Sequence, residues 1–112
     1  MNYQHVKVAE LEETCHVGVL HMSPAALVAT FGNPNNGVTS TESIGEYYYK
    51  SENGDFFVVY SLDPDVTVEN IEQTKHQFWN VKDPVPFSIG AKHDADVGDF
   101  KYWIRKQIID NS

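Results

Sequence analysis

The stretch that decides the fold is residues 43–62, SIGEYYYKSENGDFFVVYSL. Two runs rich in aromatic and β-branched residues, 43–50 and 55–62, flank the polar segment 51–54. That segment contains Asn-Gly, the strongest short signal for a hairpin turn, because both residues tolerate positive φ. Residues 56–60, FFVVY, are apolar or aromatic at every position. This pattern predicts a central strand that is covered on both faces.

Two further strands are predicted, one before the hairpin in the sequence at 15–22 and one after it at 85–91, because both runs are rich in apolar and β-branched residues. Between the first of these strands and the hairpin, Ser23-Pro24 predicts the start of a helix over 25–31, since Ser is a good N-cap and Pro suits the first helical position. Gly32 then suits the end of that helix.

A second helix is predicted from about 96 to 109, with Asp94 or Asp96 as its N-cap. Its apolar stripe is formed by Val97, Phe100, Ile104 and Ile108. Residues 77–81 are assigned as an additional strand, and 66–77 fits either a short helix or an irregular excursion.

Together these elements predict a single α+β domain over residues 1–112. The expected architecture is an antiparallel sheet of about 4–5 strands with two helices packed on one face, in the order β-α-β-β-(β)-β-α. Residues 1–13 are expected to form a loosely ordered segment or an edge strand.

Composition excludes several classes of function. With 16 acidic and 8 basic residues the net charge is −8, which disfavours sequence-independent nucleic-acid binding. No apolar run approaches the roughly 18 residues of a membrane helix, and the N-terminus lacks a signal-peptide pattern, so a cytoplasmic location is predicted. The single cysteine, Cys15, excludes an internal disulfide framework and is expected to be buried.

Several short motifs occur in a recognisable order: Phe31-Gly32-Asn33-Pro34, Gly45-Glu46-Tyr47, Asn53-Gly54-Asp55, Val59-Tyr60 and Phe87-Ser88-Ile89-Gly90-Ala91. This order resembles a group of small proteins encoded by bacteriophages and large DNA viruses. The resemblance covers about residues 17–91, although Tyr47 and Phe87 stand where the pattern has Trp. It implies a small viral accessory protein in the host cytoplasm, and it supplies no catalytic residues.

The residues themselves carry no catalytic signature. The sequence has no phosphate loop, dinucleotide fingerprint or nucleophile elbow. None of the five histidines has the spacing of a metal pair; they are His5, His16, His21, His76 and His93. We therefore expect no enzyme, no cofactor and no metal.

The crowding of aromatic residues on the hairpin allows two interpretations. Strand alternation sends Tyr47 and Tyr49 to one face and Tyr48 to the other. The tyrosines then either fill the core or present an exposed face to a partner. The second interpretation predicts binding to a host protein, with an anti-defence inhibitor as one form of that role. Its candidate contacts are Glu46, Tyr47, Tyr49, Asp63 and Asp65. Pairing of the exposed face with a second copy would give a homodimer through the sheet.

Two alternative functions remain open. A protein that binds and sequesters a small molecule or nucleotide would need cations, for which Lys92, Lys101 and Arg105 are the candidate cluster. A virion or assembly component would instead form a stable symmetric oligomer.

Overall fold

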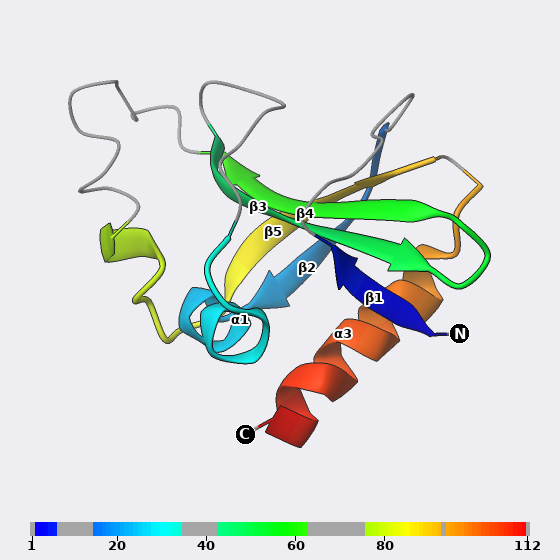
Figure 1. Ribbon diagram of the computed structural model, residues 1–112. Coiled ribbons are helices and arrows are strands. Elements are labelled where there is room, and N and C mark those ends of the chain that lie inside the picture. The colour runs from blue at the N-terminus through cyan, green and yellow to red at the C-terminus, as the bar shows by residue number, and fades with distance from the viewer. Residues whose placement is uncertain (1, 7–14, 35–42, 63–75, 93, 112) are drawn as a thin grey trace.

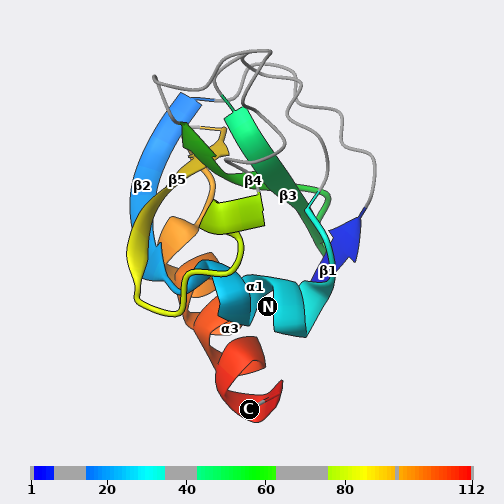
Figure 2. The same cartoon turned by 90° about the vertical axis from the view of Figure 1, so that its left-hand side faces the viewer.

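The computed structural model describes residues 2–6, 15–34, 43–62, 76–92 and 94–111 (Figure 1). Its elements follow in the order β1 (Tyr3–Val6), β2 (Cys15–Met22), α1 (Pro24–Phe31), β3 (Ser43–Ser51), β4 (Phe56–Leu62), β5 (Val85–Ala91) and α3 (Val97–Asn111). The strands form one sheet in the order β1-β3-β4-β5-β2, and every neighbouring pair is antiparallel. Both helices cover the same face of this sheet (Figures 1 and 2). The predicted α+β fold is confirmed.

The hairpin forms as the sequence predicts. The chain reverses between β3 and β4, where Gly54 has φ +95° and its N–H donates to the Ser51 carbonyl at 3.0 Å. The β4 strand lies third of five in the sheet. Its side chains are buried on both faces, with exposed fractions of 1% for Phe57, 2% for Val58 and 0% for Val59. The prediction of a covered central strand is therefore confirmed.

A glycine near the start of β3 allows Trp79 and Pro34 to pack closely against this strand. The register of β3 against β4 shifts between Ser43 and Glu46, and Gly45 lies within the shift with φ +144°. A Cβ atom at this position would lie 2.8 Å from Cζ2 of Trp79 and 3.0 Å from Pro34. Only glycine combines this backbone conformation with the close approach of the indole ring.

The boundaries of both helices follow their capping residues. Ser23 Oγ accepts a hydrogen bond from the Ala26 N–H at 3.2 Å, and Pro24 occupies the first turn of α1. The Asp96 carboxylate accepts from the Asp99 N–H at 3.1 Å at the start of α3. These contacts confirm the predicted N-caps, because each satisfies an amide that has no partner within its helix.

The core lies between the sheet and the two helices. On α3, Phe100 and Ile104 have exposed fractions of 0%, as the apolar stripe predicts. The ring of Phe100 stacks on Phe57 of β4 with centroids 4.5 Å apart and an interplanar angle of 10°. Burial of each such side chain stabilises the fold by about 1.5–3 kcal/mol.

One predicted strand is wrong. Residues 76–78 are helical and 79–80 form a turn, where a strand was expected over 77–81. The Val81 carbonyl accepts from the Ala25 N–H at 3.0 Å and from the Ser23 hydroxyl at 3.3 Å, so the backbone of this segment bonds to the start of α1. Residues 3–6 form the edge strand β1, whereas most of the ambiguous 66–77 stretch lies outside the described residues.

Candidate functional site

Two tyrosines predicted to bind a partner belong to the core. Tyr47 and Tyr49 both have an exposed fraction of 0%, because the face of β3 that carries them is the one the helices cover. The Tyr47 hydroxyl donates to the Gly32 carbonyl at 2.6 Å. The Tyr49 hydroxyl has no hydrogen-bond partner in the part of the chain that the structure describes. Their assignment as surface contacts is wrong, and the alternative that they fill the core holds for both.

Glu46 is also buried, although its side chain points to the opposite face of the sheet. Its exposed fraction is 0%, and its carboxylate accepts a 2.5 Å hydrogen bond from the Tyr48 hydroxyl. Burial, followed by this hydrogen bond and the carboxylate charge, raises the pKa of Tyr48. Glu46 therefore takes part in a buried hydrogen bond, and its assignment as a surface contact is wrong. Asp63 and Asp65, the remaining two candidates, lie outside the described residues.

The candidate anion-binding cations are separated along the chain. Lys92 is exposed directly after β5, whereas Lys101 and Arg105 lie one turn apart on α3. Neither of the two hollows described next is lined by any of these three residues. The cation on α3 that does line a hollow is Lys106, which was not among the residues predicted from the sequence.

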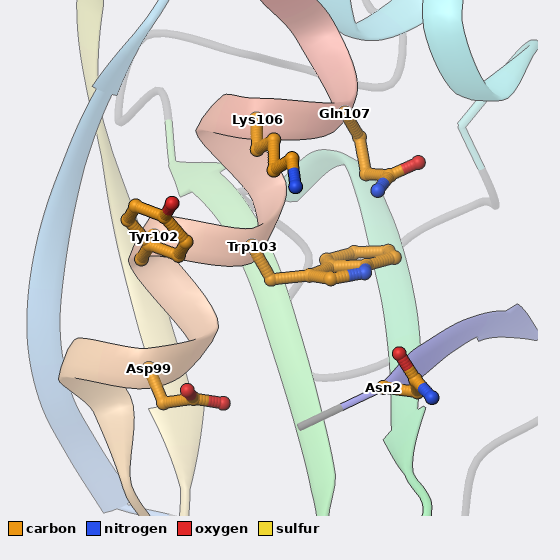
Figure 3. Close-up of a pocket in the computed structure, with 6 residues that line it drawn as sticks. All are labelled: Asn2, Asp99, Tyr102, Trp103, Lys106 and Gln107. Atoms are coloured by element: carbon orange, nitrogen blue, oxygen red, sulfur yellow. The ribbon is translucent and has the colours of Figure 1, made fainter. Parts of the chain in front are cut away.

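The first hollow lies between α3 and the beginning of β1 and has a volume of about 270 Å³ (Figure 3). It is lined by Asn2, Asp99, Tyr102, Trp103, Lys106 and Gln107. In Figure 3 the indole of Trp103 points across the hollow, with Lys106 and Gln107 on one side of it and Asn2 on the other. The site therefore combines an aromatic surface with one ammonium group, one carboxylate and two amides.

Aromatic side chains on the core side of Trp103 fix the position of its ring. Its indole stacks on Phe31 of α1 with centroids 6.1 Å apart and an interplanar angle of 29°, and it lies 5.2 Å from the ring of Tyr3. The side chain is half-buried, so one part belongs to the core and another part faces the hollow. An aromatic surface held in this way binds with little loss of conformational entropy.

A hydrogen bond joins β1 to α3 beside the hollow. The Tyr3 hydroxyl, from β1, donates to the Asp99 carboxylate of α3 at 2.7 Å. Burial is the largest cause that raises the pKa of Tyr3, and the hydrogen bond to Asp99 comes second. The neutral phenol therefore keeps its proton and continues to hold the strand against the helix at neutral pH.

A second hollow of about 340 Å³ continues from the first along β1, and Asn2 lines both. Its remaining lining comes from β1 and the end of β3, namely Tyr3, Gln4, Lys50, Ser51 and Glu52. Lys50 contributes its charge here, while its ammonium lies 5.4 Å from the centroid of the Phe56 ring. The two hollows thus extend the site from α3 to the β3–β4 turn.

Large hydrophobic side chains are exposed on β2 and on α3, where Tyr102 lines the first hollow. Within the described residues these are Val19, Tyr102 and Ile109, with exposed fractions of 37%, 70% and 70%. Tyr102 and Ile109 lie two turns apart on the same side of α3, and Lys106 lies between them. We call Tyr102, Trp103, Lys106 and Ile109 the α3 surface. The signal in the sequence was the position of Tyr102 and Ile109 opposite the apolar stripe of this helix.

Other functional expectations concern metals, the cysteine and membranes. Among the described residues, no three His, Cys, Asp or Glu side chains lie close enough to hold a metal ion. Cys15 is exposed at the start of the edge strand β2, so the expectation that it is buried is wrong. None of the helices in the described ranges is long and apolar enough to cross a membrane.

Comparison with known proteins adds no relative: no protein-family model matches the chain, and no curated protein sequence matches it significantly.

Proposed function

We propose that this protein acts by binding another protein, without catalysis, and that the α3 surface is its contact site. The observation that carries the proposal is the 70% exposure of both Tyr102 and Ile109 on α3, the helix whose Tyr102 and Trp103 line the first hollow. Trp, Tyr and Arg are the residue types that most often dominate the energy of protein interfaces. Arg105 is exposed on the same helix, next to Lys106.

The size and charge of the hollows favour a protein side chain over a nucleotide. Their volumes, about 270 and 340 Å³, lie at the low end for small-molecule pockets. Each hollow is lined by a single lysine, Lys106 or Lys50, so the phosphates of a nucleotide would meet one ammonium group. A planar side chain that stacks on Trp103 suits the first hollow better, because the charges of Lys106 and Asp99 in its lining balance each other.

The resemblance to small bacteriophage and large-DNA-virus proteins supports a more specific form of this proposal. In that form the protein is an accessory factor in the host cytoplasm, its partner is a host protein, and inhibition of a defence component is the outcome. The contact residues differ from those expected, since the α3 surface replaces the hairpin.

The test is quantitative affinity capture from host lysate, followed by titration of each enriched protein against the purified chain. The double variant Tyr102→Ala/Ile109→Ala should lose the partner, and Tyr102→Ala alone should weaken binding about thirtyfold, which corresponds to about 2 kcal/mol. Lys106→Ala should weaken binding as well, whereas Lys82→Ala, an exposed lysine in the turn before β5, serves as the matched control.

Retention of the same partner by the double variant would contradict the proposed site. A thermal shift with cyclic nucleotides, in the absence of any enriched protein, would favour the small-molecule alternative.

A further inference from the structure

Among the residues that the structure describes, one edge of the sheet has no neighbour over a long strand. β2 is the last strand in the order β1-β3-β4-β5-β2 and pairs only with β5 among the described strands. In Figure 2 β2 and β5 lie together at one margin of the sheet. The backbone N–H and C=O groups along such an outer side can accept a further strand.

This edge lacks most of the features that prevent pairing between natural sheets. Its sequence, CHVGVLHM, contains no Lys, Arg, Asp, Glu or Pro over eight residues. Charged residues, Pro and short length are the usual means of protecting an edge strand. The opposite edge strand, β1, is only four residues long and is protected by its length. In β2 the register shift between His16 and Gly18 is the one protective feature, and it leaves Gly18–Met22 regular.

The side chains of β2 divide cleanly between the two faces. Leu20 and Met22 point into the core, with exposed fractions of 0% and 9%. Val19 and His21 point to the other face and are exposed, Val19 to 37%. An apolar β-branched side chain therefore stands exposed near the middle of the open strand, where it would meet the side chains of an added strand.

The lack of charge along β2 allows a second copy of this chain to pair at this edge. Two molecules of net charge −8 repel one another over most of their surfaces. Along β2 they meet without any formal charge when histidine is counted as neutral. Antiparallel pairing of identical strands is also symmetric, so each copy presents and receives the same edge.

We propose that β2 pairs antiparallel with β2 of a second copy and joins two five-stranded sheets into one continuous sheet. Residues directly opposite each other in an antiparallel pair point to the same face. The helix-covered faces of both copies consequently lie on one side, and the α3 surfaces stay outside the interface. This homodimer forms through the edge of the sheet, whereas the sequence suggested pairing through an exposed face.

The test is the mass in solution of the wild-type chain and of two variants, measured by sedimentation equilibrium over a range of concentrations. The wild type should reach twice 12.7 kDa. Val19→Lys should raise the dimer dissociation constant at least about tenfold, because each copy then brings a positive charge to an edge that otherwise pairs without charge. Val19→Thr, which keeps a neutral β-branched residue, should remain dimeric. Far-UV circular dichroism should match for all three proteins, since Val19 is exposed.

Hydrogen exchange supplies an independent measurement of the same contact. In the dimer, amides of Gly18–Met22 should exchange more slowly than in Val19→Lys at equal concentration, and amides of α3 should not differ. A wild type that stays monomeric at the highest concentration measured would overturn the proposal. A dimer that Tyr102→Ala dissociates and Val19→Lys does not would overturn it too, and would assign self-association to the α3 surface.

Discussion

The Tyr3 hydroxyl donates a 2.7 Å hydrogen bond to the Asp99 carboxylate, across 96 positions of sequence. Tyr3 belongs to the edge strand β1 and Asp99 to the first turn of α3. Asp99 also lines the hollow in which Trp103 lies. The N-terminal strand and the C-terminal helix therefore form the candidate site together.

Tyr3→Phe should lower the free energy of unfolding by about 1–2 kcal/mol, because it removes a hydrogen bond to a charged acceptor and keeps the ring. Urea denaturation measures this change. Tyr102→Phe is the matched control, since the Tyr102 side chain is 70% exposed, and it should change stability by less than about 0.5 kcal/mol. Equal effects of the two substitutions would show that the hydrogen bond to Asp99 adds nothing to the free energy of unfolding.

Tyr49→Phe should leave stability unchanged or raise it by about 1 kcal/mol, because the hydroxyl it removes is buried and has no partner in the described part of the chain. Tyr47→Phe, on the same face of β3, should instead lower stability by about 1 kcal/mol through loss of the bond to Gly32. Thermal and urea unfolding of both variants measure the difference. A greater loss for Tyr49→Phe than for Tyr47→Phe would contradict this prediction.

Stability should fall as the pH rises above 10. Burial raises the pKa of Tyr47 and Tyr49 above the ordinary value of 10.0, and burial with a carboxylate neighbour does so for Tyr3 and Tyr48. A group whose folded pKa is raised stabilises the fold below its unfolded pKa, and this contribution is lost as the pH rises through the folded pKa. Each such tyrosine contributes a loss of about 1.4 kcal/mol per pH unit above 10.

Urea unfolding at a series of alkaline pH values measures this slope. Tyr49→Phe should make it shallower by the contribution of one tyrosine. A stability that is flat between about pH 10 and 12 would contradict the burial of these phenols.

Gly45→Ala should destabilise the fold by about 2–4 kcal/mol, because its Cβ would lie 2.8 Å from Trp79 and its φ is +144°. Gly54→Ala is the control: φ is +95° there, but no atom lies within 4 Å of the added Cβ. It should cost about 1 kcal/mol of backbone strain alone. Denaturation midpoints of the two variants compare them directly, and similar losses would exclude steric conflict with Trp79 as the cause.

Much of the secondary structure could be predicted from the sequence because its signals are local. The Asn-Gly turn between two aromatic runs specified β3 and β4, and Ser23-Pro24 specified the start of α1. The apolar stripe of α3 specified which of its residues are buried. The prediction of a strand over 77–81 was wrong because the aromatic residues there are typical of strands. The bonds of Val81 to Ser23 and Ala25 link parts of the chain that are far apart in sequence, so no local pattern reveals them.

The sequence by itself determined the alternation of Tyr47, Tyr48 and Tyr49 across the sheet, since that depends only on the period of a strand. Only the tertiary structure decided that Glu46, Tyr47 and Tyr49 are buried while Tyr102 is exposed, because burial depends on which elements cover a face. The candidate site likewise arises where β1 meets α3, through contacts between opposite ends of the chain. Such long-range packing leaves no local pattern, and the fold alone brings these residues together.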